Sequence, residues 1–140
     1  MSPAASPTEQ RVRPRRRVRL RVDARVLSEQ ERVDILAGLG FPELEHEVPS
    51  LPRPRSGFQQ AESRDASASG LRLALGSLAG VEQGGSISLD VHLPGERRVV
   101  RLLGDVIWSG DKDGELMAGL RIAALDVEGM QRLWRALEKD

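Results

Sequence analysis

The sequence predicts an all-β fold with helical additions, a six-stranded antiparallel barrel followed by a C-terminal α-helix. Three observations lead to this prediction. Short segments in which apolar and polar residues alternate recur along the chain, which is the period-two pattern of half-buried strands. Turn signals separate these segments, namely Pro94-Gly95 and Asp111–Gly114. Residues 126–140 instead follow a helical period, and closure of the sheet into a barrel would remove exposed strand edges.

The expected strands are placed by their alternation. The first runs from Val18 to Val26, with apolar residues on one face and arginines or Asp23 on the other. Beyond Phe58 the pattern stays β-like, and Gly104 inside one long run predicts a bulge or a bend. The later strands are expected near residues 71–75, 87–93, 99–108 and 116–122.

An insert at about residues 28–57 separates the first strand from the rest of the sheet. Ser28 followed by Glu31 is a capping box, which predicts a short helix that the two following glycines end. Several prolines before Gly57 then predict an extended linker. The short helix carries one apolar stripe, formed by Val33, Leu36, Ala37 and Leu39.

A second helix is expected at the C-terminus. Asp126 is expected to cap it, and its apolar residues recur with the period of a helix that packs one face on the barrel. Trp108 and Trp134 are expected in the core, with ligand stacking by either ring as the less favoured alternative. The apolar face of this helix consists of Val127, Met130, Leu133, Trp134 and Leu137.

Positive charge is distributed unevenly, although the formal net charge is zero. Arginine is concentrated between Arg11 and Arg25, where Asp23 is the only acidic residue. A GC-rich genome can raise the arginine content of a protein, but it does not explain local clustering. A high local density of positive charge predicts an anionic partner.

Composition also bears on the compartment and on domain organisation. The sequence has no apolar run of membrane-spanning length, no apolar core of a secretory signal and no cysteine. These features are expected for a cytoplasmic protein without membrane insertion. Residues 1–10 are rich in Ser, Pro and Ala and are expected to be disordered, and residues 11–140 are expected to form a single domain.

Motifs of catalysis are missing from the sequence. None of the phosphate-binding, dinucleotide-binding, zinc-protease or nucleophile-elbow patterns occurs, so neither an enzyme nor a cofactor or metal is expected. His92 alternates with apolar residues and is expected to face solvent from a strand. His46 lies among glutamates and is expected to belong to a solvated charged surface. Asp111 and Asp113 are expected to form the hairpin turn, because the ligand spacing of a calcium loop is absent.

The first candidate for ligand binding is the run from Arg13 to Arg17. A guanidinium presents a rigid fork of donors that can bind a phosphate at two points or bond to the O6 and N7 edge of guanine. Arginines on a flexible segment could therefore surround a small guanine-containing anion. Taken alone, the run favours a solvated basic tail, or one that binds nucleic acid or anionic lipid without specificity.

The second candidate is the hexapeptide Asp65-Ala66-Ser67-Ala68-Ser69-Gly70. In extended backbone Asp65 and Ser67 point to the same side, and Gly70 permits a sharp turn into the next strand. A carboxylate suits the N1 and N2 donors on the Watson–Crick edge of guanine, and a hydroxyl can add another bond. Taken alone, the hexapeptide is more often a turn that satisfies only its own backbone.

Taken in order, the two motifs resemble the PilZ domain family, whose signature is R-x-x-x-R before the first strand and [DN]-x-S-x-x-G further on. Arg13 and Arg17 match the first element, and Asp65, Ser67 and Gly70 match the second. The run also offers Arg11 with Arg15, Arg15 with Arg19 and Arg17 with Arg21, but the later pairs would place their second arginine inside the strand. The resemblance extends to the C-terminus, although the insert lengthens the usual gap between the two motifs.

The resemblance implies a PilZ-type barrel that binds cyclic di-GMP at its rim and is not an enzyme. The arginines would grip phosphates and guanine edges, while the hexapeptide would hold a guanine. The arginine segment would become ordered on binding and pass the signal to a partner protein. The residues implied to bind the ligand are Arg13, Arg17, Asp65, Ser67 and Gly70, with Arg15 and Arg16 as auxiliary contacts.

Two alternatives from other functional classes remain at the level of sequence. One is a ligand-independent interaction domain of the same fold, which would use the insert at 28–57 as its docking surface. The other is nonspecific nucleic-acid binding by the arginine tail, which predicts a steep dependence on salt. The scarcity of aromatic residues, two Phe and two Trp without Tyr, argues against a platform for stacking single strands.

Overall fold

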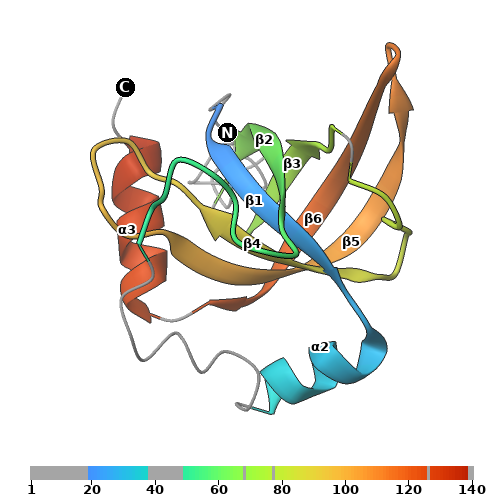
Figure 1. The fold of residues 1–140 in the computed structure, drawn as a ribbon, viewed down its shortest axis with the longest axis horizontal. Helices are drawn as coiled ribbons and strands as arrows, with labels where there is room; N and C mark the ends of the chain where they lie inside the picture. Colours follow the sequence, from blue (N-terminus) through green and yellow to red (C-terminus); the bar gives the residue numbers. More distant parts are fainter. Residues whose placement is uncertain (1–18, 38–48, 68, 77, 126, 139–140) are drawn as a thin grey trace, which may run out of the picture.

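The computed structural model of the chain describes residues 19–37, 49–67, 69–76, 78–125 and 127–138. Six antiparallel strands close into a barrel in the order β1-β2-β3-β6-β5-β4 (Figure 1). The predicted fold class, an antiparallel barrel with a C-terminal helix and a short helix in the insert, is therefore confirmed. The strands are β1 (Arg21–Leu27), β2 (Gln59–Ala66), β3 (Gly70–Ala74), β4 (Ser86–Val91), β5 (Val100–Lys112) and β6 (Glu115–Leu125).

The apolar faces of the strands form the core, as their alternation predicts. Leu20, Val22 and Ala24 are buried on β1, and Leu71 and Leu73 lie on the same inner side of β3. Burying a Val or Leu side chain of this kind stabilises the fold by roughly 1.5–3 kcal/mol relative to an exposed one. The core is completed by Ile87, Leu89, Val91, Leu102, Val106, Ala118 and Leu120 from the remaining strands and by Leu133 from the C-terminal helix.

The predicted irregularities of β5 and β6 are present. The register between these strands shifts at Leu103/Gly104, where a Cβ on Gly104 would lie 3.1 Å from the Leu120 side chain. At the other end of the pair, Asp113 and Gly114 adopt φ values of 54° and 81°, as a tight hairpin turn requires. Figure 1 shows this hairpin extending beyond the closed part of the barrel. Leu116 is 38% exposed, although it shares the alternation of the buried residues on β6.

Helix α3 (Val127–Glu138) lies against one side of the barrel (Figure 1). Leu133 and Leu137 are buried there, and Arg132 donates to Glu96 Oε1 at 2.7 Å and to the carbonyl oxygens of Val99 and Arg98. The predicted apolar face is correct only in part, because Met130 is 42% exposed and Trp134 is only half-buried. The predicted cap, Asp126, lies outside the described residues.

Helix α2 (Glu29–Leu36) begins with the predicted capping box, in which Ser28 and Glu31 satisfy each other's backbone N–H groups. All eight of its residues are described and none of them is buried. Val33 and Leu36 are each 47% exposed, so the predicted apolar stripe does not enter the core. The stripe stays exposed because α2 follows β1 and lies past the end of the barrel, where no strand of the described part of the chain covers it (Figure 1).

His92 corrects a prediction, because it does not face solvent. Its ring Nδ1 lies 2.6 Å from Ser50 Oγ, its Nε2 lies 2.8 Å from Asp23 Oδ2, and its side chain is 10% exposed. The last part of the insert covers this part of the barrel, since Ser50 contacts His92 and Pro49 forms a bridge with Arg98. Strand alternation cannot show that a segment far away in the sequence covers an outer face. His46 lies outside the described residues.

No helix in the described part of the chain is long and apolar enough to cross a membrane.

Candidate functional site

The predicted turn joins β2 to β3 and is built by local hydrogen bonds. The N–H of Ser67 donates to the Gly70 carbonyl oxygen at 2.9 Å, and the N–H of Ser69 lies 3.4 Å from Ser67 Oγ. The register of β2 shifts between Ser63 and Asp65, so the strand is bulged just before the turn. A bulge of this kind re-aims side chains and is frequent beside binding sites. The structure thus places Ser67 and Gly70 in one hydrogen-bonded turn, and Asp65 lies two residues before Ser67 on β2.

Asp65 is held by an arginine that the sequence analysis did not assign to the site. Arg72 is its partner across the β2–β3 pair, and Arg72 Nε lies 3.0 Å from Asp65 Oδ2. Arg72 Nε is buried in this ion pair, but the geometry of the contact is not that of a hydrogen bond. Asp65 is itself buried. The ion pair with Arg72 thus fixes the Asp65 carboxyl group beside the turn.

The entry into β1 is fixed beside β2. The N–H of Leu20 donates to Ser63 Oγ at 2.8 Å, and the N–H of Ser63 donates to the Leu20 carbonyl oxygen at 2.9 Å. Strands β1 and β2 are antiparallel, so the start of β1 lies beside the end of β2, where Asp65 is located. The predicted ligand-binding arginines, Arg13, Arg15, Arg16 and Arg17, lie outside the described residues.

A cleft of about 400 Å³ lies between the start of β1, strands β2 and β3, and the β5–β6 hairpin. Its lining carries four basic side chains and two carboxylates. Ion pairs offset much of this positive charge, because Arg64 binds Glu62 and Glu115 at 3.0 and 2.6 Å, Arg72 binds Asp65 at 3.0 Å, and Arg19 lies 3.9 Å from Glu62. The cleft is lined by Arg19, Arg64, Arg72, Lys112, Asp113, Glu115 and Met117.

Trp108 corrects a second prediction, because it lies outside the core. It pairs with Gly119 on β6, and a Cβ at residue 119 would overlap its indole, which shows that the ring lies across Gly119. Gly119 in turn pairs with Arg72 on β3. The half-buried indole therefore lies on the outer face of the sheet, in the same row as the ion pair of Arg72 and Asp65, with Lys112 Nζ 5.9 Å from its ring centroid.

A second cluster of charged residues is centred on Asp105 of β5. Asp105 pairs with Arg121 of β6, which in turn pairs with Gly70 of the turn. Its carboxylate accepts from Arg32 of α2, from Ser86 of β4 at 2.9 Å and from Arg121 of β6 at 3.3 Å. The hydrogen bonds from Arg32, with further ones from Ser86 and Arg121, lower the pKa of Asp105 to about 2 against the opposing effect of burial. Asp105 is therefore ionised near neutral pH.

Asp105 predicts a pH dependence of stability. Its pKa is lower in the fold than in the unfolded chain, so the ionised group stabilises the protein above about pH 4, and this contribution is lost as the pH falls toward 2. Asp105→Asn should cost about 2 kcal/mol of unfolding free energy at pH 6 and much less at pH 2.5, measured by urea denaturation. Asp111→Asn, at an exposed position near the end of β5, should change it by less than about 0.5 kcal/mol at either pH. A loss from Asp105→Asn that is equal at both pH values would contradict this account.

Several residues of the site were missed by sequence reasoning. The signal for Arg72 was present, because in a hairpin closed by residues 67–70 it lies opposite Asp65. Lys112 and Trp108 had no comparable signal, since they reach this face only through closure of the barrel. Among the described residues, no group of three or more His, Asp or Glu side chains could hold a metal ion.

A closed antiparallel barrel with an acceptor turn and a cleft lined by basic side chains on its outer face defines a small barrel domain with a candidate ligand site. A model of the PilZ domain family matches residues 8–139. The chain therefore belongs to the PilZ domain family, whose members are ligand-binding domains with cyclic di-GMP as the ligand. None of the curated proteins compared with the chain matches it.

Two solved structures share the fold. The chain is 16% identical to the inhibitor of motility MotI/DgrA of Bacillus subtilis, with a TM-score of 0.60 over 89% of this chain and 47% of that one. It is 18% identical to a tetrameric PilZ domain of Xanthomonas campestris that assembles through a helical bundle, with a TM-score of 0.50 over 97% and 94% of the two chains. The chain thus spans about half the length of MotI/DgrA, and the likeness concerns the fold.

Proposed function

We propose that this chain is a cytoplasmic receptor for cyclic di-GMP, in which Asp65, Ser67 and Gly70 hold one guanine. The observation that carries the proposal is the buried carboxylate of Asp65, kept beside the turn by the Arg72 guanidinium. A carboxylate accepts hydrogen bonds in the pattern that guanine N1 and N2 offer, whereas adenine lacks this pair of donors. Recognition at the turn is therefore expected to select guanine.

The covalent chain supports a role for Arg13 and Arg17 in the same site. Arg17 precedes Leu20 by three residues, a span of at most about 10 Å. Leu20 is bonded to Ser63, two residues before Asp65 on β2. A side chain as long as that of arginine can reach a ligand at the turn from this position. The proposal assigns Arg13 and Arg17 to the phosphates and guanine edges, with Arg15 and Arg16 as auxiliary charge.

The outer face beside the turn supports the same ligand. Four basic side chains line the cleft, and such groups can bind the two phosphates of cyclic di-GMP. The Trp108 indole lies in the same row of residues as Arg72 and Asp65 and offers an apolar face for a base. We therefore add Arg72 and Trp108 to the proposed site.

Signalling is proposed to pass to a partner protein. Binding would order the arginine segment before β1, since phosphates neutralise its mutual repulsion. Two neighbours in the fold, an inhibitor of motility and a self-assembling PilZ domain, are consistent with action through protein contacts. The second candidate function is a ligand-independent interaction domain, and the exposed Val33 and Leu36 of α2 favour it.

Isothermal titration of the full chain with cyclic di-GMP tests the receptor function. We expect saturable binding at micromolar concentrations and no detectable binding of cyclic di-AMP, which has the same phosphate ring without the guanine donors. Equal binding of both ligands would show phosphate attraction without recognition at Asp65. Absence of heat from folded protein would overturn the receptor function and leave the interaction domain as the better candidate.

A further inference from the structure

The turn of the proposed ligand site contacts β6 at one arginine. Gly70 is the register partner of Arg121, and the N–H of the next residue, Ile122, donates to the Ser69 carbonyl oxygen at 2.9 Å. The Arg121 side chain is 65% exposed, so it can change direction without disturbing the core. Arg121 therefore links the turn, which its backbone contacts, to the group that its side chain binds.

Arg121 shares its carboxylate with an arginine of α2. Arg121 Nη2 lies 3.3 Å from Asp105 Oδ2, while Arg32 makes a bidentate pair with both oxygens at 3.0 Å. Two guanidinium groups thus bind the same oxygen, Asp105 Oδ2. The two positive charges are therefore close together and repel each other. The shorter, two-point pair of Arg32 is the stronger of the two contacts.

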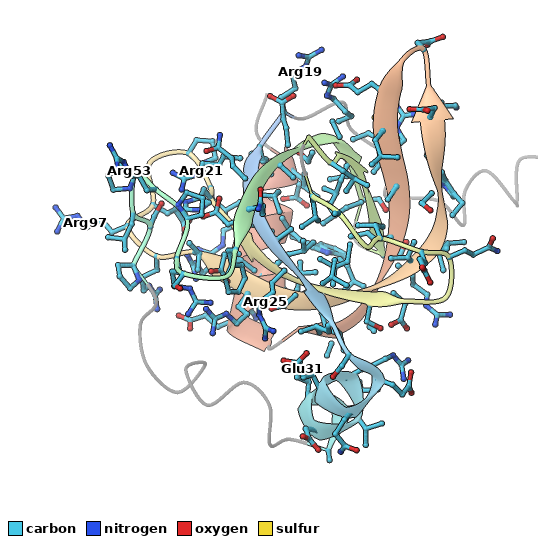
Figure 2. All side chains as sticks on the ribbon, turned by 45° about the vertical axis from the view of Figure 1, so that its right-hand side comes forward. Arg19, Arg21, Arg25, Glu31, Arg53 and Arg97 are labelled. Carbon is cyan, nitrogen blue, oxygen red and sulfur yellow. The ribbon has the colours of Figure 1, made fainter. Side chains whose placement is uncertain are left out.

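The position of α2 depends on this carboxylate. None of the eight residues of α2 is buried, so apolar packing contributes little to holding the helix on the barrel. A second ion pair, Arg25 Nη1 to Glu31 Oε2 at 2.8 Å, joins the first turn of α2 to the β1 strand (Figure 2). Arg32 is the contact that reaches across to β5, because Asp105 belongs to that strand.

We propose that Arg121 is a positioning residue that couples the ligand turn to α2 through Asp105. This inference rests on the proposed function, because the coupling ligand is the dianion cyclic di-GMP at the Ser67–Gly70 turn. An anion beside Gly70 draws the Arg121 guanidinium toward itself and away from Asp105. The repulsion on Arg32 then falls, and Arg32 binds Asp105 more tightly. Ligand binding therefore fixes α2 on the barrel more firmly.

The direction of this coupling follows from the contacts of Arg121. Among the described residues its guanidinium bonds to Asp105 and not to α2. When Arg121 moves away, Arg32 therefore loses a competitor for the carboxylate, and α2 loses no contact of its own. Linkage makes the effect reciprocal, so a docked α2 must raise the affinity for the ligand by the same factor. An effect of one partly exposed ion pair corresponds to about a two- to five-fold change.

Hydrogen exchange of the α2 amides in the full chain tests the coupling. With saturating cyclic di-GMP, exchange should slow about two- to five-fold. Arg121→Gln should slow exchange in the ligand-free protein by a similar factor and abolish the further response to ligand. Arg32→Gln should speed exchange with and without ligand and should weaken ligand binding about two- to five-fold by titration.

The possible failures are distinguishable. Binding by titration with unchanged or faster α2 exchange would overturn the coupling and leave the receptor function intact. Unchanged exchange in ligand-free Arg121→Gln would overturn the repulsion on which the coupling depends, whatever the ligand does. Absence of binding would overturn the proposed function, and the inference would fall with it.

Discussion

Arg17→Ala should weaken cyclic di-GMP binding by about 2–3 kcal/mol, or roughly 30- to 150-fold, without unfolding the barrel. The loss follows from the removal of a charged, two-point contact to phosphate or guanine, which a neighbouring arginine in the run cannot replace with the same geometry. Titration measures the affinity, and the thermal unfolding transition shows whether the fold persists. Among the described residues the core begins at Leu20, three residues after Arg17, so we expect the fold to persist.

Arg53→Ala is the matched control for this experiment. Arg53 is exposed and projects from the segment before β2 (Figure 2), so its loss removes the same charge from another part of the surface. The affinity should change by less than about two-fold, since single exposed charges act weakly at distance. Equal losses from both variants would mean that net charge, and not the R-x-x-x-R motif, controls binding. Full binding by Arg17→Ala with loss in Arg15→Ala would show that another register of the arginine run is used.

Arg101→Ala should destabilise the protein by about 3–5 kcal/mol, a large part of the 5–15 kcal/mol that is typical of a domain. Arg101 and Asp90 are 3% and 2% exposed, and Arg101 Nε lies 2.9 Å from Asp90 Oδ1. Burial raises the pKa of the Asp90 carboxyl, and Arg55, 3.1 Å from Oδ2, acts in the opposite direction. Removing Arg101 leaves a buried carboxylate with one partly exposed partner.

Urea denaturation measures this effect, and two further variants test its cause. Arg55→Ala should cost less than Arg101→Ala, because Arg55 is one-third exposed and solvent can replace it. Replacing both buried partners, as Asp90→Leu with Arg101→Met, should cost less than Arg101→Ala alone, since no buried charge is then left unpaired and Arg55 is open to solvent. A single Arg101→Ala variant within about 1 kcal/mol of wild type would show that Asp90 is neutral in the fold.

The site and the insert together indicate how a PilZ domain could report on its ligand. The turn, Arg121, Asp105 and Arg32 form one connected series of contacts from the outer face of β3 to α2. The exposed Val33 and Leu36 lie on the helix at the end of this series. The two candidate functions, receptor and interaction domain, therefore involve connected parts of one molecule, and the exchange experiment relates them directly.

Most of the fold was predictable because the signals are local. Alternation marks the strands because successive side chains point to opposite faces, and Leu71 and Leu73 are buried as that period requires. The Ser28 capping box and the turn at Asp113 and Gly114 also depend only on neighbouring residues. The proposed acceptor turn at Asp65 belongs to this class, since its geometry is closed by hydrogen bonds within a few residues.

The remaining features depend on which segments meet after the barrel closes. His92 is covered because the segment around Ser50 packs against it, and Trp108 lies outside the core because it covers Gly119 on the neighbouring strand. The apolar stripe of α2 stays exposed because the helix lies beyond the end of the barrel. Period and spacing specify a strand, a cap or a turn, whereas burial and ion pairing depend on contacts between residues far apart in the sequence, and those contacts exist only once the sheet has closed.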